Sequence, residues 1–322
     1  MTNLLFSSMR NEGPAVLEWI AYHLSIGFDQ IMIATNNCDD GSDDLIRALG
    51  QIAPVTHIDN GDHGEDSPQR RAYERMMETP EFKAAEYLMI LDADEFLNIH
   101  DGSGKLSDLI TAMGDHDVMG VNWACFGPSG EMQWRDAWVT ERFTERLVPK
   151  WGLYAVGSCK ALTRAPQRFR RFFNHSPGPK IDRSDISYLR DYGEVETIAS
   201  DGAAKRHMRM NYAYKVEYRH AQINHYVTKS MPEFRLRIAR GRGHVARREN
   251  DRHTFEYFKQ YVDEHEMVQD TSIARHLDAV KQKACELLEN SLVLKAYTNC
   301  QKTFEQRVKQ ATRDWDETRY EI

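Results

Sequence analysis

Three carboxylates follow directly after an apolar run, at a spacing that suits metal and phosphate chemistry. The run covers residues 87–91, and Asp92, Asp94 and Glu95 come next. Five apolar residues without alternation predict a fully buried central strand of a parallel sheet. Ligands of such sheets bind beyond the carboxyl ends of the strands, and alternation along an extended backbone puts Asp92 and Asp94 on one side. Hard oxygen ligands so placed suit Mg²⁺ or Mn²⁺ bridging phosphate oxygens. The alternative is a strand that ends in a solvated acidic turn.

Two earlier loops carry polar side chains that we expect at the same edge of the sheet. One follows the first predicted strand and the other follows the second, and their carboxylates and amides can hydrogen-bond a base and a ribose. A turn followed by a helix N-cap at Ser42 is an alternative for the second loop. Arg70 and Arg71, on the helix predicted before the central strand, either face the same cleft or lie on a solvated face. The predicted ligand contacts are Arg10, Asn11, Glu12, Asn36, Asp39, Asp40 and Arg70.

The elements that must position these residues alternate between strand and helix. Pro14 fits the first turn of a helix that ends at Gly27, and two shorter helical patterns follow before residue 87. Three such alternations predict a doubly wound α/β fold. Residues 164–202 are predicted to be extended loops, and the chain is predicted to be helical from Met231 onward. The expected strands are 3–7, 30–34, 54–58, 87–91, 117–126, 154–162 and 221–227.

Bulk composition narrows the class of protein. The chain has 322 residues, of which 41% are hydrophobic and 28% charged, as in an ordinary soluble protein. A net charge of −7 argues against general nucleic-acid binding. No apolar stretch approaches the roughly 20 residues of a membrane-spanning helix, and the N-terminus lacks a signal-peptide pattern. We therefore expect a cytoplasmic protein, with the inner membrane face as a further possible location. The five cysteines are odd in number and include no C-x-x-C pair, which predicts reduced thiols.

Several motifs together resemble one enzyme family. They are Met9-Arg10-Asn11-Glu12, Glu18-Trp19, Asp92-Ala93-Asp94-Glu95-Phe96 and the later run HYVTKSMPEFRLRIARGRG over 225–243. The chain resembles the family 2-type glycosyltransferases of the GT-A fold, particularly their bacterial branch, and is similar to the related family 92 enzymes. The resemblance covers most of residues 3–260. It implies a GT-A domain over 1–262, with a nucleotide-binding half (1–100) and an acceptor half (101–262), and leaves 263–322 as a helical C-terminal extension.

The resemblance implies an activity and a set of ligands. A sugar would pass, with inversion, from a UDP- or GDP-sugar donor to a hydroxyl of a glycan or lipid-linked acceptor in polysaccharide or glycoconjugate synthesis. Asp92 would approach the ribose or the metal, and Asp94 would bind Mn²⁺ or Mg²⁺ on the diphosphate. His225 matches the histidine that often completes the metal shell, although an ordinary core or surface histidine is the alternative.

Two further roles have several candidates each. Departure of a nucleoside diphosphate develops negative charge, which fixed cations stabilise. The candidates are Lys229 and the arginines at 235, 237, 240 and 242; Lys229 and Arg240 are the preferred pair, with Arg235 and Arg242 in reserve. An inverting displacement also needs a base that takes the acceptor proton. A W-x-x-F-G segment that resembles the family's acceptor-side loop favours Glu131. The alternative is that Glu131 is a solvated loop carboxylate without a catalytic role. Trp123, Phe126, Trp134 and Trp138 would stack on sugars or pack in the core. The candidate bases are Glu131, Asp136, Glu141 and His175.

Two other functions and an assembly role stay open at this point. Haloacid-dehalogenase-type phosphatases also end a buried strand in D-x-D, but there the strand usually comes first and Thr or Val follows the motif. A degenerate GT-A domain that binds a sugar or a protein without turnover is a second alternative. The C-terminal helices pack back on the domain, mediate self-association or dock on a membrane-bound assembly; their apolar residues favour packing.

Overall fold

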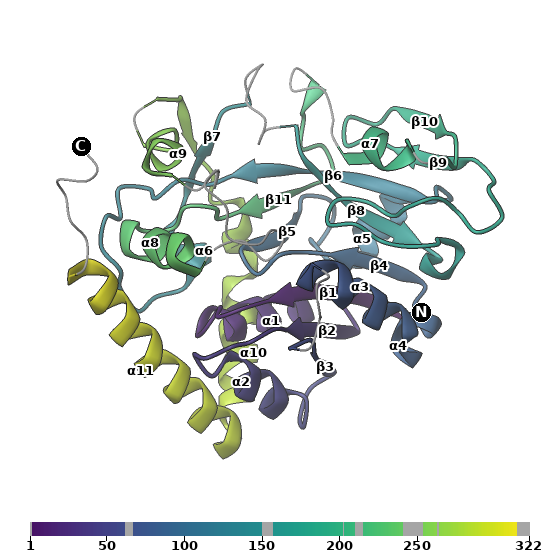
Figure 1. The fold of residues 1–322 in the computed structure, drawn as a ribbon. Helices are drawn as coiled ribbons and strands as arrows, with labels where there is room; N and C mark the ends of the chain where they lie inside the picture. The colour runs from purple at the N-terminus through teal and green to yellow at the C-terminus, as the bar shows by residue number, and fades with distance from the viewer. Residues whose placement is uncertain are drawn as a thin grey trace.

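A mixed β-sheet runs through the molecule (Figure 1). The computed structural model describes residues 2–61, 67–149, 157–201, 203–209, 215–240, 254–262 and 264–313. The strands are β1 (Asn3–Met9), β2 (Gln30–Thr35), β3 (Val55–Asp59), β4 (Tyr87–Ile90), β5 (Glu95–Ile99), β6 (Val118–Cys125), β7 (Glu145–Leu147), β8 (Cys159–Arg164), β9 (Ile186–Leu189), β10 (Val195–Ile198), β11 (Ala221–His225) and β12 (Met267–Gln269).

Helices flank the sheet and continue to the end of the described chain. They are α1 (Ala15–Ile26), α2 (Ser42–Leu49), α3 (Pro68–Glu78), α4 (Pro80–Ala84), α5 (Leu106–Met113), α6 (Val139–Arg142), α7 (Ala204–Arg209), α8 (Met231–Arg240), α9 (Phe255–Lys259), α10 (Leu277–Leu288) and α11 (Ser291–Arg313). Short 3₁₀ turns cover Pro166–Arg168 and Ser272–His276.

The strand order confirms the predicted α/β class. β3, β2, β1 and β4 lie side by side in parallel. Beyond β4, antiparallel β8 leads to β6, β9 and β10, and β11 joins β6 to β5. Within the described chain, five of the nine pairings of this sheet are parallel. Because parallel neighbours end at one edge, the loops after β1, β2 and β4 meet there.

Helices cover both faces of the sheet, as alternation along the strands requires. In β1, Leu5 points into the core formed with α1, α2 and α10. Its neighbours Leu4 and Phe6 point into the opposite core, which includes residues of α3 such as Tyr73 and Met76. Both sides of β1 are therefore buried, which explains its three consecutive apolar residues Leu4, Leu5 and Phe6.

Helix α1 begins and ends where the sequence predicts. Pro14 directly precedes its first residue, and Gly27 ends it in the left-handed region with φ of 110°. The Gly27 N–H donates to the Leu24 carbonyl at 3.2 Å, and the Phe28 N–H donates to the His23 carbonyl at 3.1 Å. The closed C-terminus turns the chain directly into β2.

The helices beyond residue 262 share the main core. α10 packs along α1, and α11 runs along α2 and α8, as the yellow helix in Figure 1 shows. Val280, Leu287 and Val293 are buried in the same cluster as the residues of α1. The packing role is confirmed for these helices. The domain division at 262/263 and self-association through these helices stay predictions.

The second half of the chain differs from the sequence-based expectation in two places. Residues 164–202 were predicted as loops, but they contain β9 and β10, which pair antiparallel. The Arg190 guanidinium bonds Glu196 across this hairpin at 2.7 Å, so charged residues that suggested a loop stabilise strands. The region after Met231 was predicted as helical, but β12 pairs with β7. Both strands of that pair have three residues, too few for a periodic signal.

The described residues contain neither a disulfide nor a membrane-spanning helix. The five cysteines all lie within them, and none forms a disulfide, as predicted. No helix in the described ranges is long and apolar enough to cross a membrane.

A buried histidine is expected to make the fold acid-sensitive. His23 is fully buried, and its ring stacks on Phe96 with centroids 5.7 Å apart. Nδ1 lies 2.8 Å from the Trp19 carbonyl oxygen, and the Leu97 N–H donates to Nε2 at 3.4 Å. Burial lowers the pKa of His23 to about 3, against the opposing effect of the Trp19 hydrogen bond. The folded chain therefore holds this imidazole neutral.

The pH dependence follows from the difference between the folded and unfolded chains. Below about pH 6.5 the unfolded chain binds a proton at the His23 side chain, whereas the folded chain does so only near pH 3. The free energy of unfolding therefore decreases as the pH is lowered from about 6.5 toward 3. We expect this residue alone to lower the free energy of unfolding by about 2 kcal/mol between roughly pH 7 and pH 5. Urea unfolding of the wild type and of His23→Gln at both pH values measures the difference. Equal pH slopes in the two proteins would contradict it.

Candidate functional site

The loops after β1 and β2 are tied together at the carboxyl edge of the sheet. The Asn11 side-chain amide donates to Asp39 Oδ1 at 2.6 Å, and the Asp39 N–H donates back to Asn11 Oδ1 at 2.9 Å. The Gly13 N–H donates to Asp40 Oδ2 at 2.8 Å. Asp40 also accepts from Ser42 at the start of α2, so a turn accounts for Asp40. The predicted N-cap at Ser42 is wrong, because Ser42 is the first helical residue and Gly41 is at the N-cap. These bonds fix the edge on which the remaining site residues lie.

The two aspartates of the D-x-D motif face different cations. Asp92 and Asp94 lie in the turn between β4 and β5. Asp92 Oδ2 lies 3.1 Å from Lys160 Nζ and accepts from the Asn174 amide at 3.2 Å. Asp94 is ion-paired to Arg237 and lies 3.4 Å from His225 Nε2. The segment is a turn and not an extended strand, but both carboxylates line the same cavity, the one beside α3.

Opposite charges decide the ionisation of these groups. Burial opposes ionisation of Asp94, but Arg237 and His225 outweigh it and hold the pKa of the carboxyl well below its usual range. Burial likewise raises the pKa of Asp92, and Lys160 reverses the direction to a lowered value. For His225, burial lowers the pKa, against Asp94. At neutral pH the motif therefore presents two ionised carboxylates.

Glu95, the third acidic residue after the apolar run, is buried in the protein interior. Glu95 begins β5, is fully buried, and its Oε2 lies 2.9 Å from Lys160 Nζ. Oε2 also accepts the Asp92 backbone N–H at 2.8 Å. Burial raises the pKa of Glu95 to about 8, against the effect of Lys160. One buried ammonium thus serves two acidic side chains, and Glu95 supports the turn from beneath.

Two cavities open at this edge and meet at the D-x-D turn. The α3 cavity, of about 620 Å³, lies between α3 and residues 171–176; the α11 cavity, of about 520 Å³, lies between α8, α11 and residues 134–139. Both volumes are in the range of about 300–1,000 Å³ common for small-molecule sites. The residues that line both cavities are Arg10, Glu12, Asp94 and Arg237.

The two cavities differ in charge. Among described lining residues, the α3 cavity has more cations than carboxylates, and the α11 cavity has the reverse. The α3 cavity is lined by the cations Arg10, Arg70, Arg171, Lys205, Arg209 and Arg237 and the carboxylates Glu12, Glu74, Asp92 and Asp94. The α11 cavity is lined by the carboxylates Glu12, Glu18, Asp39, Asp40, Asp94, Asp136 and Glu233 and the cations Arg10, Arg142, Lys229, Arg237 and Arg307.

The predicted ligand contacts divide between the cavities. Asn36, Arg70 and Asp92 line the α3 cavity, where Arg70 also pairs with Glu74 at 3.1 Å. Asn11, Asp39, Asp40 and Lys229 line the α11 cavity. The side chain of Arg240 and the whole of Arg242 lie outside the described residues, whereas Arg235 is described but lines neither cavity.

The predicted bases also separate. Asp136 lines the α11 cavity and accepts from the Gln301 amide at 3.1 Å. His175 lines the α3 cavity, with Nδ1 2.9 Å from the Cys159 carbonyl oxygen. Glu131 and Glu141 line neither cavity, and Glu141 pairs with Lys281. Proximity in sequence to the Trp123–Gly127 segment therefore does not bring Glu131 to a cavity wall.

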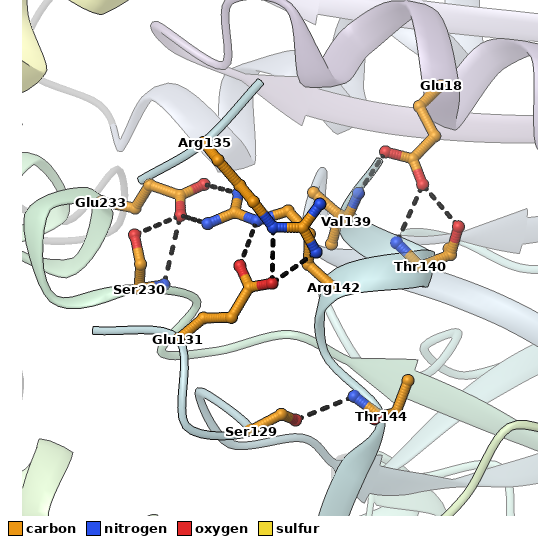
Figure 2. Close-up of polar contacts among 10 residues, drawn as sticks. All are labelled: Glu18, Ser129, Glu131, Arg135, Val139, Thr140, Arg142, Thr144, Ser230 and Glu233. Carbon is orange, nitrogen blue, oxygen red and sulfur yellow. Dashed lines mark hydrogen bonds and ion pairs between the residues drawn. The ribbon is translucent and has the colours of Figure 1, made fainter. Parts of the chain in front are cut away.

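Figure 2 shows what Glu131 does instead. The buried Arg142 donates from Nε to Glu131 Oε2 at 2.7 Å and from Nη2 to Glu233 Oε2 at 2.9 Å. Glu233 accepts from the Ser230 hydroxyl at 2.5 Å, at the start of α8. Since Arg237 lies one turn further along α8, this network fixes the helix that carries it.

A second buried carboxylate in Figure 2 holds α6 against α1. Glu18 Oε2 accepts the Val139 N–H at 2.7 Å, and Oε1 accepts the Thr140 N–H at 3.0 Å and its hydroxyl at 2.7 Å. Burial raises the pKa of Glu18, against these hydrogen bonds. The Glu18-Trp19 motif thus places the segment that ends at Trp138 over the α11 cavity.

The arrangement does not fit a divalent cation shared by the predicted ligands. Carboxylate and imidazole are suitable donors for Mn²⁺. Asp92, however, faces Lys160, and Asp94 faces Arg237. The described part of the chain holds no group of three or more His, Cys, Asp or Glu side chains placed to bind a metal. His225 Nδ1 has no hydrogen-bond partner either, whereas metal-bound histidines usually have one on the second nitrogen.

Sequence comparison adds one relative. No protein-family model matches the chain. Over 149 residues, 44% of its length, the chain is 29% identical to a glycosyltransferase family 92 protein from Oryza sativa subsp. japonica. The matched stretch is similar to a glycosyltransferase. The chain spans 24% of the length of that protein, about a quarter.

Solved structures of other proteins show weaker likeness. S. aureus TarS 1-349 in complex with UDP is 14% identical with a TM-score of 0.32, covering 51% of this chain and 47% of that one. A second structure of TarS 1-349 is 12% identical with a TM-score of 0.35, covering 97% and 82%. HddC from Yersinia pseudotuberculosis is 10% identical with a TM-score of 0.32, covering 64% and 98%.

Sequence reasoning missed the two cations that pair with the D-x-D motif. Lys160 lies in the buried strand β8, and a lysine inside an apolar strand is a signal for a buried acidic partner. Arg237 was considered only as one of several arginines around 235–242. Its four-residue spacing from Glu233 is visible in the sequence, but its contact with Asp94 is not.

Proposed function

We propose that the chain is a glycosyltransferase that moves a sugar from a nucleotide-sugar donor to an acceptor hydroxyl. The observation that carries this proposal is the pair of cavities of opposite charge that share Asp94 and Arg237 as a common wall. A transferase of this kind needs a site for a diphosphate and a site for a hydroxyl, with the reacting bond between them. Similarity to the family 92 protein supports the same activity.

The α3 cavity is the proposed donor site. Its excess of cations suits a diphosphate, and it lies beyond the carboxyl ends of β1, β2 and β4, where ligands of α/β sheets bind. Arg237 reaches the D-x-D turn from α8 and is proposed to stabilise the charge that develops on the leaving diphosphate. UDP- and GDP-sugars are the donors proposed from the sequence.

The acceptor hydroxyl would enter from the α11 cavity. Its oxygen attacks the anomeric carbon, the bond from that carbon to the diphosphate oxygen breaks, and the diphosphate leaves with the bonding electrons. Asp136 is proposed to take the hydroxyl proton, because it is the candidate base on this cavity wall. Attack from the side opposite to the leaving group gives inversion, in agreement with the sequence-based expectation.

A requirement for Mn²⁺ or Mg²⁺ stays a prediction from the sequence. The proposed attack of the hydroxyl, the departure of the diphosphate and the proton transfer to Asp136 do not depend on a metal. For Asp92, Asp94 and His225 to share a cation, Arg237 would have to leave Asp94. Nucleotide binding measured with Mn²⁺, with Mg²⁺ and with EDTA decides the point. Binding that persists in EDTA shows that the fixed cations suffice, and binding only with metal shows that a divalent cation is required.

The proposal is tested by thermal melting with a panel of nucleoside diphosphates and nucleotide sugars under these conditions. A ligand at 100 times its dissociation constant adds about 2.7 kcal/mol of stability. Arg237→Ala should weaken binding about 10- to 100-fold, since a hydrogen bond to a charged group contributes about 1.5–3 kcal/mol. Leu294→Ala, an exposed site on α11, is the matched control and should bind normally.

Two results would contradict the proposal. If no nucleotide stabilises the wild type, the donor site is wrong. If a nucleotide sugar binds but is neither transferred nor hydrolysed, the degenerate-domain alternative holds, in which the fold binds without turnover.

A further inference from the structure

We propose that the α11 cavity binds a neutral carbohydrate acceptor and that helix α11 forms the wall that selects it. This inference rests on the proposed glycosyltransferase function and adds the chemical class of the acceptor. The cavity shares Asp94 and Arg237 with the proposed donor site. A ligand in it therefore lies next to the place where the sugar–diphosphate bond breaks.

Helix α11 contributes Tyr297, Phe304 and Arg307 to this cavity. Arg307 fixes the helix to the loop after β2, because its guanidinium donates to the Asp39 carbonyl at 2.7 Å and lies 3.0 Å from Asp39 Oδ1. Phe304 lies against Trp134, with ring centroids 5.6 Å apart. The C-terminal helix is thus built into the site and does not merely cover the domain.

The facing wall is equally well fixed. Trp134 and Trp138 line the cavity on the segment leading into α6, which Glu18 holds at Val139 and Thr140. Arg142 then ties α6 to Glu233 of α8 (Figure 2). A binding site is selective only when its side chains are held by such supporting contacts.

The lining favours a sugar. Trp134, Trp138, Tyr297 and Phe304 are all partly exposed, and aromatic rings at that depth can pack on the apolar face of a sugar ring. Carboxylates between the rings can accept hydrogen bonds from hydroxyl groups, and the exposed Asp136 is one of them. Rings that are neither fully buried nor fully solvated, with polar groups between them, are typical of small-molecule sites.

The charges argue against an anionic acceptor. Seven carboxylates and five cations line the described part of the cavity. Three of those cations pair with carboxylates of the same lining: Arg142 with Glu233, Arg237 with Asp94, and Arg307 with Asp39. These pairs cancel, and the rest of the described lining has four carboxylates and two cations. A phosphate-bearing acceptor would meet net negative charge here, and a neutral glycan would not. We therefore assign a neutral carbohydrate.

The test is saturation-transfer NMR on the full chain with methyl α- and β-glycosides of common hexoses, with the bound nucleoside diphosphate present. Phe304→Ala and Trp134→Ala should weaken binding of the preferred glycoside about 3- to 10-fold, as expected for the loss of one aromatic contact. Leu294→Ala on the same helix is the matched control and should leave binding unchanged. Phe304→Leu, which keeps apolar volume but not the flat ring, separates loss of stacking from loss of packing.

Each outcome bears on one proposal. Weaker glycoside binding in Phe304→Ala, Trp134→Ala and Phe304→Leu, with nucleotide-induced melting shifts unchanged, supports the acceptor site. Unchanged glycoside binding in these variants overturns the acceptor-site proposal and leaves the proposed function intact. A panel in which no glycoside binds the wild type has the same consequence. Preferential binding of glycerol phosphate over every glycoside also overturns it, in favour of an anionic acceptor. Failure of all nucleotides to bind the wild type overturns the proposed function itself.

Discussion

Replacing Asp136 by asparagine is expected to lower the rate of sugar transfer by about 10²–10⁴-fold, the usual contribution of a general base. The exchange keeps the shape of the side chain, and the asparagine oxygen can still accept from Gln301. Nucleotide binding should therefore be unchanged, since Asp136 lines only the α11 cavity. Initial rates at saturating donor, together with nucleotide melting shifts, measure both quantities.

Acceptor acidity provides the discriminating readout for Asp136. A hydroxyl that loses its proton easily, such as a phenol, needs less help from a base, so Asp136→Asn should slow its glycosylation less than that of an alkyl hydroxyl. Glu131→Gln is the matched control, because Glu131 pairs with Arg142 and Arg135 and lines neither cavity. That variant is expected to lower stability without this dependence on the acceptor. An equal loss for both acceptors in Asp136→Asn would assign Asp136 a positioning role only.

Replacing Lys160 by methionine should lower the free energy of unfolding by about 3–5 kcal/mol, the usual cost of removing one partner of a buried ion pair. Lys160 is fully buried, and its Nζ lies 3.1 Å from Asp92, 2.9 Å from Glu95 and 2.7 Å from Asn174 Oδ1. The variant leaves the ionised Asp92 carboxylate without its cation, and it removes a polar partner of the buried Glu95, whose pKa burial raises to about 8. Urea unfolding measures the loss, and nucleotide binding should weaken with it because the D-x-D turn loses its support.

A second substitution separates charge from packing at Lys160. In the double variant Lys160→Met/Asp92→Asn, the uncompensated carboxylate is gone, so a large part of the lost stability should return. Asp92→Asn alone in the presence of Lys160 should cost less than Lys160→Met. If the double variant is as unstable as Lys160→Met, the loss arises from packing around the lysine stem. The ion pair would then contribute little.

The sequence alone determined the scaffold and the edge on which the site lies. Apolar runs and their spacing report burial within one element, so the strand at residues 87–91 and the α/β class were predictable. Pro14 and Gly27 defined α1 because proline and glycine impose local backbone geometry. The strands β9 and β10 were missed because they have four residues each among charged neighbours.

Only the tertiary structure decided which side chains meet at that edge. Arg237 is 143 residues from Asp94, and no local pattern distinguishes it from the neighbouring arginines on its helix. Lys160 and Asp92 meet because antiparallel β8 lies beside β4. Helix α11 supplies a cavity wall that no sequence motif predicted. Its Arg307 contacts Asp39, which is 268 positions away in the chain. Contacts of this kind depend on how elements pack, because local periodicity fixes which face of an element is buried but not which partner covers it.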